Sequence, residues 1–218
     1  LIEHRARGKP VAYLTGKREF WSFELQVNPA VLIPRPETEL LVELALQHGK
    51  GLPGPIADLG TGSGAIALAL ALERPDWQVH ATELSEAAAQ VAAANIGQSG
   101  LGNVWLFHGS WCSPLPENDY GLIVSNPPYI DADDPHLPAL ASEPRSALVA
   151  AEGGLADLRA IAVAARHKLV IGGWLLLEHG WQQGAGVRGL LAEAGYRLIA
   201  THRDHGGRDR VTLGRWMG

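Results

Sequence analysis

The segment Asn126-Pro127-Pro128-Tyr129 contains the side chains with the clearest chemical potential in this sequence. It directly follows the apolar run 121–125, which predicts a buried strand. Each proline lacks an N–H and has a fixed φ, so the strand must end there, and Pro128 biases Pro127 toward extended backbone. The pattern predicts a stiff hook that holds the Asn126 amide, the neighbouring carbonyls and the Tyr129 ring in a fixed relation. An ordinary strand-ending turn is the alternative interpretation.

A glycine-rich turn, Gly60-Thr61-Gly62-Ser63-Gly64, is the second feature that suggests a ligand. It joins a strand predicted over 56–59 to a helix predicted over 65–72. Glycines allow a tight turn and a close ligand approach, and N–H groups at the start of the helix point at the ligand. The spacing matches neither a phosphate loop nor a dinucleotide loop. Asp58, just before the turn, suits a ligand with positive charge, such as the sulfonium and ammonium of S-adenosylmethionine.

Two further residues follow predicted strands at positions that suit a nucleoside. Glu83 ends the strand predicted over 78–82, where a carboxylate can accept both ribose hydroxyls. In isolation it would read as a solvated Glu before Ser85, the predicted cap of the next helix. Combined with the glycine-rich turn, ribose binding is the better interpretation. Trp111 follows the third strand and could place its ring beside an adenine, or pack in the core.

The composition is that of an ordinary globular protein, with 218 residues, of which 46% are hydrophobic and 19% charged. The net charge of −5 provides no overall positive field for a nucleic acid, although it does not exclude a local basic patch. Cys112 is the only cysteine, which fits a reducing compartment. With no long apolar run and no signal peptide, the sequence predicts a soluble, cytoplasmic protein. The first residue is Leu1, which suggests a fragment or a chain whose start is not included in the sequence.

Metal and hydrolase chemistry are not expected. His202 and His205 are close in sequence, but neither a Cys partner nor an HExxH pattern accompanies them. There is no Gly-x-Ser-x-Gly elbow for a hydrolase triad.

The elements that must position these residues alternate between strand and helix from residue 56 onward, which predicts a doubly wound, mostly parallel α/β sheet. The predicted strands are 56–59, 78–82, 104–107, 122–124 and 174–177, with a closing antiparallel pair at 196–201 and 211–213. The predicted helices are 37–46, 65–72, 85–96, 155–169 and 187–194. Earlier in the chain, 11–15 and 19–27 are predicted as strands of a hairpin that turns at Gly16-Lys17. Its aromatic side chains suggest a flap packed on the main domain, which could also cover a cofactor.

Together these features resemble the release-factor glutamine N5-methyltransferases, a branch of the class I S-adenosylmethionine-dependent enzymes. The similar segments extend over nearly the whole chain and are Arg5–Pro10, Tyr13–Gly16, Glu19-Phe20, Leu32–Glu39, Asp58–Gly64, Asn126–Tyr129, Glu178–Gln183 and Arg210-Val211. The hook alone is shared with enzymes that methylate amino groups of DNA and RNA. The segment Ile33–Glu39 is more particular to the glutamine-modifying family.

The resemblance implies a seven-stranded Rossmann-like methyltransferase sheet with an antiparallel C-terminal strand, preceded by a small β-hairpin. Residues 35–218 would form the catalytic domain, and 1–34 would remain from a largely missing N-terminal helical domain that docks the substrate. The implied cofactor is S-adenosylmethionine, with S-adenosylhomocysteine as product and no metal. The implied cofactor contacts are Gly60, Thr61, Gly62, Ser63, Gly64, Glu83, Trp111 and Asn126, with Phe20 as a further lid contact. Ser110 stands where relatives commonly have an acid that could contact adenine.

The implied substrate is the glutamine of the Gly-Gly-Gln segment in class I peptide chain release factors, held by Asn126, Pro127, Pro128 and Tyr129. We expect the Asn126 side-chain oxygen and the Pro127 carbonyl to accept the two amide hydrogens, while Tyr129 packs on the amide plane. We expect a monomer that binds neither nucleic acid nor membrane. The nearest rival is a methyltransferase acting on amino groups of adenine or guanine, which the negative charge and the segment Ile33–Glu39 disfavour. A non-enzymatic nucleotide-binding domain is a more distant rival.

Overall fold

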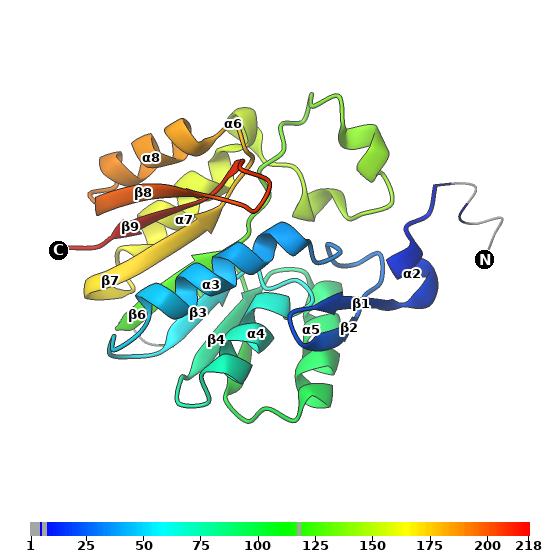
Figure 1. The fold of residues 1–218 in the computed structure, drawn as a ribbon, viewed down its shortest axis with the longest axis horizontal. Coiled ribbons are helices and arrows are strands. Elements are labelled where there is room, and N and C mark those ends of the chain that lie inside the picture. Colours follow the sequence, from blue (N-terminus) through cyan, green and yellow to red (C-terminus); the bar gives the residue numbers. More distant parts are fainter. Residues whose placement is uncertain (1–4, 6–7, 117–118) are drawn as a thin grey trace.

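A seven-stranded sheet forms the centre of the computed structural model, which describes residues 5, 8–116 and 119–218 (Figure 1). The strands are β3 (Ile56–Leu59), β4 (Val79–Glu83), β5 (Val104–His108), β6 (Tyr120–Ser125), β7 (Leu169–Glu178), β8 (Arg197–Arg203) and β9 (Asp209–Arg215). Their order across the sheet is β5-β4-β3-β6-β7-β9-β8. The first five strands are parallel, and β9 runs antiparallel to both β7 and β8. The predicted fold class is therefore confirmed.

Helices cover both faces of this sheet, which explains why the central strands β3 and β6 are buried along their whole length. The longer helices are α3 (Glu39–His48), α4 (Ala65–Glu73), α5 (Glu86–Ser99), α7 (Ala156–Ala165) and α8 (Gly184–Glu193). Helices α3 and α4 pack on one face with Ile56, while α7 and α8 pack on the other with Ala57. Neighbouring strand residues thus enter different cores, as the alternation of a strand requires.

Short helical turns connect the larger elements near the carboxyl ends of the parallel strands. They are η1 (Pro36–Thr38), η2 (Leu137–Leu140), η3 (Arg145–Ala147) and α6 (Ala151–Gly154). A bridge between Ile130 and Val149 closes the base of the segment 131–148. An ion pair between Arg35 and Glu143 holds this segment against the chain before η1. The segment therefore has a defined place beside the sheet edge.

The N-terminal prediction was wrong in part, because Val11–Thr15 is the helix α2 and not a strand. Pro10 occupies its N-cap, and Gly16, with φ of 74°, ends the helix in the left-handed conformation that favours glycine. Gly16 is therefore a helix terminus and not the hairpin turn. The hairpin lies further on, between β1 (Lys17–Phe20) and β2 (Phe23–Gln26). Residues 1–4, 6 and 7 of the predicted segment 1–34 lie outside the described residues.

The hairpin packs on the helices beside the sheet, as predicted for a flap (Figure 1). Phe20 and Leu25 are buried in the same core as α3 and α4. Asn95 on α5 accepts from the backbone N–H of Gln26 at 2.8 Å and donates to its carbonyl at 3.0 Å. It also donates to the carbonyl of Ser63 at 2.8 Å. One buried amide thus ties the hairpin to the glycine-rich turn.

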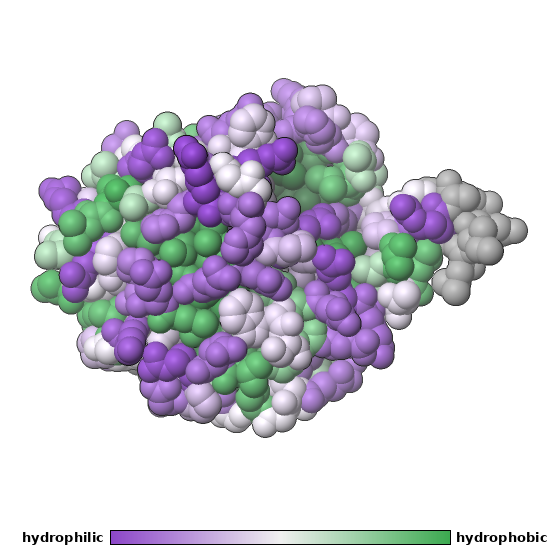
Figure 2. Space-filling view, in the orientation of Figure 1, coloured by the Kyte–Doolittle hydropathy of each residue, from purple (hydrophilic) through white to green (hydrophobic). Residues whose placement is uncertain are grey.

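The surface is mixed in character on the face shown in Figure 2, where hydrophobic and hydrophilic residues are interspersed. Within the described part of the chain, every helix is too short or too polar to cross a lipid bilayer.

Candidate functional site

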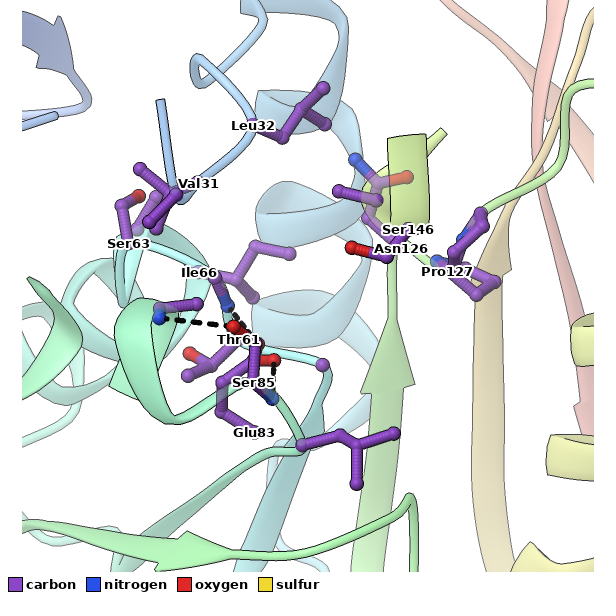
Figure 3. Close-up of a pocket in the computed structure, with 18 of the residues that line it drawn as sticks. Val31, Leu32, Thr61, Ser63, Ile66, Glu83, Ser85, Asn126, Pro127 and Ser146 are labelled. Carbon is purple, nitrogen blue, oxygen red and sulfur yellow. Dashed lines mark hydrogen bonds between the residues drawn. The ribbon is translucent and has the colours of Figure 1, made fainter. Parts of the chain in front are cut away.

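A cavity of about 420 Å³ opens at the carboxyl ends of the central parallel strands. Its lining includes residues that directly follow β3, β4, β5 and β6, namely Gly60–Ser63, Leu84-Ser85, Gly109–Trp111 and Asn126–Pro128, together with Glu83 at the end of β4. This edge is where ligands bind in open α/β sheets. In Figure 3, Asn126 and Pro127 lie on the opposite side of the cavity from Val31 and Ser63. The cavity volume is within the range of small-molecule sites.

The glycine-rich turn takes a conformation that only glycines adopt easily. Gly60 and Gly62 have φ values of 71° and 57°. The N–H groups of Gly60 and Thr61 both donate to the Thr82 carbonyl at 2.9 Å, which fastens the turn to β4. A Cβ at Gly60 would come within 3.0 Å of the Trp111 ring, whereas one at Gly62 would meet no atom within 4 Å. The turn therefore packs under Trp111 and leaves open space at Gly62.

Asp58 supports this turn from inside the protein. It is fully buried, and its Oδ2 accepts from the Thr61 hydroxyl at 2.6 Å and the Ala67 N–H at 3.2 Å. Burial raises the pKa of Asp58 to about 7, and the two hydrogen bonds oppose that rise. Its Oδ1 has no hydrogen-bond partner among the described residues. Asp58 does not line the cavity, so its visible role is to brace the turn.

Glu83 is held so that its carboxylate faces the cavity with a fixed orientation. One oxygen, Oε2, accepts from the Gly62 N–H at 2.9 Å, and Oε1 accepts from the Ser85 N–H at 2.9 Å. Ser85 itself caps α5, because its hydroxyl accepts from the Ala88 N–H at 3.3 Å. Each carboxylate oxygen keeps further lone pairs for a ligand. A pair of neighbouring hydroxyl groups, as in a ribose, is the ligand feature that this arrangement suits.

The hook follows β6 as predicted, and it separates two cavities. Asn126 and Pro127 line the first cavity and also a second one of about 450 Å³. Tyr129 lines only the second, together with apolar residues that include Ile130 and Leu148. A group in one cavity can therefore meet a group in the other beside Asn126.

Contacts from several elements make the hook rigid. Gln183 donates through Nε2 to the Tyr129 carbonyl at 2.9 Å. A Cβ at Gly154 would lie 2.1 Å from that same carbonyl, so only glycine fits there. At the end of β6, the Ser125 hydroxyl donates to the Leu59 carbonyl at 2.7 Å. The backbone of the hook is thus fixed against both β3 and α6.

The side chains of the hook reach a buried carboxyl. Asn126 donates through Nδ2 to the Thr38 hydroxyl at 3.3 Å, and the Tyr129 hydroxyl donates to Glu178 Oε1 at 3.3 Å. Burial raises the pKa of Glu178 to about 7, while Thr38 and Arg210 act to lower it. Burial and the nearby Glu178 carboxyl also raise the pKa of Tyr129, so its phenol stays protonated.

The structure brings most of the predicted site residues together. Those that line the first cavity are Gly60, Thr61, Gly62, Ser63, Glu83, Trp111, Asn126, Pro127 and Pro128, and Ser110 joins them. Gly64 does not line it, because it is the left-handed N-cap of α4 and packs against Ala92. Phe20, expected as a lid contact, is 3% exposed and lies in the hydrophobic core instead.

Sequence reasoning missed one wall of the cavity. This wall comes from the chain before α3 and includes Val31, Leu32, Arg35 and Thr38. The run Pro34-Arg35-Pro36 stands in the sequence, but nothing local shows that it folds over the glycine-rich turn. Ser146 and Ala147, from the segment held by the Arg35–Glu143 ion pair, also line the cavity without a sequence signal.

Comparisons with known proteins agree with this geometry. The family model described as "Methyltransferase small domain" matches residues 36–143. A release factor glutamine methyltransferase of Vibrio cholerae is 52% identical over 219 residues, covering 99% of this chain and 77% of the relative. One of Escherichia coli is 50% identical over 218 residues, covering 99% and 79%.

Solved structures share the fold at low sequence identity. A methyltransferase from Pyrococcus furiosus superposes with a TM-score of 0.68 at 17% identity, covering 100% of this chain and 98% of the other. A ribosomal protein L11 methylase from Lactobacillus delbrueckii subsp. bulgaricus gives 0.64 at 18% identity, covering 92% and 90%. These likenesses establish the methyltransferase fold.

Proposed function

Because this chain belongs to the release factor glutamine methyltransferase family, we propose that it methylates the glutamine of the Gly-Gly-Gln segment in class I peptide chain release factors. The methyl group goes to the side-chain amide nitrogen, N5, and comes from S-adenosylmethionine. The observation that carries the proposal is the pair of cavities that meet at Asn126 and Pro127. One cavity suits a nucleoside cofactor, and the other suits a neutral side chain.

The first cavity offers an oriented carboxylate and open space that suit the nucleoside part of S-adenosylmethionine. Glu83 offers two oriented carboxylate oxygens for the ribose hydroxyls. Trp111 and Ser110 line the region expected to hold the adenine, and the open space at Gly62 allows close approach to the backbone. When bound, the cofactor supplies a methyl group already activated by a sulfonium. A metal ion would have no task in this chemistry.

The second cavity suits the glutamine because the residues nearest the hook are neutral or apolar, and two of its three charged lining residues, Arg35 and Glu143, form an ion pair with each other. Ile130, Leu140 and Leu148 can contact the methylene groups of the glutamine, and the Tyr129 ring can pack on its amide plane. The Asn126 side-chain oxygen and the Pro127 carbonyl accept the two amide hydrogens. Both acceptors are uncharged, which fits a substrate that is neutral before and after methylation.

The catalytic problem is the weak nucleophilicity of an amide nitrogen, whose lone pair is delocalised into its carbonyl. Two fixed acceptors favour a pyramidal nitrogen with its lone pair free for attack. The same carbonyl dipoles stabilise the positive charge that develops on nitrogen, and the rigid hook holds them in place beforehand. Once the nitrogen carries the methyl group, it loses one of its two protons to solvent, which leaves a neutral amide. Fixing the reacting groups at near-attack distance contributes on the order of 7–11 kcal/mol.

We assign the catalytic unit to residues 35–218 and treat 1–34 as a separate segment, whose hairpin at residues 17–26 packs on that unit. The segment nevertheless contributes to the site, because Ala30, Val31 and Leu32 line the first cavity. The buried Asn95 amide, which bonds both Gln26 and Ser63, supports the same conclusion.

A transfer assay tests the proposal. Labelled S-adenosylmethionine is incubated with the protein and a class I release factor, or with the same factor carrying Ala in place of the Gly-Gly-Gln glutamine. We expect label only in the factor that retains the glutamine. Label in the alanine variant would refute the proposal, and comparable transfer to duplex DNA or RNA would favour a nucleic-acid methyltransferase.

A further inference from the structure

We propose that Thr38 and Glu178 are positioning residues that decide which end of the Asn126 amide faces the substrate. In this arrangement Glu178 orients the Thr38 hydroxyl, and Thr38 in turn holds the Asn126 amide nitrogen. The Asn126 carbonyl oxygen is thereby left to accept from the glutamine amide. This inference rests on the proposed function, because it concerns how the same site presents its acceptor.

An asparagine amide has no intrinsic preference for one orientation. Its oxygen and nitrogen ends have nearly the same shape, so a half-turn about the last side-chain bond changes a hydrogen-bond acceptor into a donor. With the donor end toward the substrate, Asn126 would repel the glutamine N–H that it has to accept. The rigid backbone of the hook cannot prevent this half-turn. A directional hydrogen bond to the other end of the amide is required.

Thr38 supplies that bond. It is the last residue of η1 and is 4% exposed, and its hydroxyl oxygen lies 3.3 Å from Asn126 Nδ2. A hydroxyl can donate or accept, so Thr38 fixes Asn126 only if its own proton is committed elsewhere. The question becomes which group takes the Thr38 proton.

Glu178 is the group that takes it. It lies at the end of β7, is 1% exposed, and interacts with the Thr38 hydroxyl in a way that lowers its pKa. An ionised carboxylate only accepts hydrogen bonds, so Thr38 must donate to it and can then only accept from Asn126. The Tyr129 hydroxyl already donates to Oε1, whereas the buried Oε2 has no hydrogen-bond partner among the described residues and is therefore the acceptor open to the Thr38 proton. The direction of the whole chain of bonds is therefore set by the charge on Glu178.

The groups around Glu178 control that charge. Burial, and to a smaller degree the Glu37 carboxylate, raise its pKa, while Thr38, Arg210 and Tyr129 oppose the rise, leaving a value of about 7. Arg210 is itself held by Asp204 at 3.3 Å. Below that pH, Glu178 gains a proton and can donate, so Thr38 is no longer forced to accept from Asn126. Methyl transfer should then fall on the acid side.

Matched variants test the roles in single-turnover assays of the release factor. Thr38→Val keeps the shape but removes the acceptor, and should lower the rate constant about tenfold, the effect of one lost hydrogen bond. The affinity for the release factor should stay near wild type, and the affinity for the cofactor, whose cavity Thr38 lines, is measured in parallel so that its change can be separated from the change in rate. Thr38→Ser keeps the hydroxyl and should retain the rate. Thr15→Val, which changes an exposed threonine that bonds only near its own helix, serves as the control.

Glu178→Gln separates positioning from mere support of the fold. Its amide can no longer act only as an acceptor, and it does not titrate. The variant should therefore lose the acid limb of the rate–pH profile that wild type shows near pH 7. A Thr38→Val enzyme with the wild-type rate, or a Glu178→Gln enzyme that keeps the acid limb, would overturn the inference.

A spectroscopic measurement needs neither cofactor nor transfer. The NMR signals of the Asn126 side-chain NH₂ group, identified by their absence in Asn126→Ala, should shift with pH near 7 in wild type and stay constant in Glu178→Gln. Constant signals in wild type would overturn the inference. If the wild-type protein methylates no release factor, the proposed function fails, and this titration still decides the orientation of Asn126 by itself.

Discussion

Replacing Glu83 with alanine should weaken cofactor binding more than removing another carboxylate on the same part of the surface. Both Glu83 oxygens are oriented by backbone N–H groups, from Gly62 and Ser85, each at 2.9 Å. The variant loses hydrogen bonds between a charged acceptor and the ribose, which contribute about 1.5–3 kcal/mol, or roughly 10- to 150-fold in Kd. Glu83→Gln should be intermediate, because its NH₂ group must face one of the two N–H donors.

Calorimetric titration with S-adenosylhomocysteine measures this effect without turnover. Glu86→Ala is the matched control, because Glu86 is an exposed carboxylate in the first turn of α5 that does not line the cavity. We expect its affinity to equal that of wild type. Unchanged cofactor affinity in Glu83→Ala would show that Glu83 does not contact the cofactor. An equal loss of affinity in Glu86→Ala would show that the Glu83 effect comes from general electrostatics and not from direct hydrogen bonds.

Three further outcomes are expected. Asn126→Ala should lose about 1–3 kcal/mol of transition-state stabilisation, and looser positioning could lower the rate by up to roughly 100-fold more. The loss should appear in kcat, while cofactor affinity changes little. A near-normal single-turnover rate would mean that the hook is only a strand-ending turn. Tyr129→Phe keeps the ring and should retain more activity than Tyr129→Ala, and equal losses would contradict a packing role. Asp58 has a folded-state pKa raised to about 7, so the folded protein binds its proton more tightly than the unfolded chain, and stability should fall as pH rises from about 4 to 7. Urea denaturation should show a smaller fall in Asp58→Asn, and an identical profile would contradict the buried titration.

The glycine-rich turn and the hook could be predicted from sequence because neighbouring residues alone determine their conformation. Glycines with positive φ, a carboxylate at the end of a strand and two consecutive prolines each constrain the backbone within a few residues. The parallel sheet then brings Gly60, Glu83 and Asn126 to one edge without further information. For this reason the positions of these residues around one cavity agree with the sequence analysis.

Features that depend on contacts between distant segments could not be predicted in this way. Thr38 is 88 residues from Asn126 in sequence, and nothing in either neighbourhood indicates that their side chains meet. Val11–Thr15 has residues that favour a strand, but Pro10 and Gly16 allow a helix whose one buried residue, Tyr13, donates to the Val31 carbonyl at 2.6 Å. Tertiary packing decided that element, as it did the burial of Phe20.

The site of methylation is the measurement that tests the proposed function most directly. A class I release factor is incubated with the protein and S-adenosylmethionine, digested, and mapped by tandem mass spectrometry. We expect one added methyl group, located on the side-chain nitrogen of the Gly-Gly-Gln glutamine and formed much more slowly when Asn126→Ala replaces the wild-type protein. A methyl group on another residue, or an unmodified release factor under conditions in which the protein binds the cofactor, would contradict the assignment of this site to glutamine methylation.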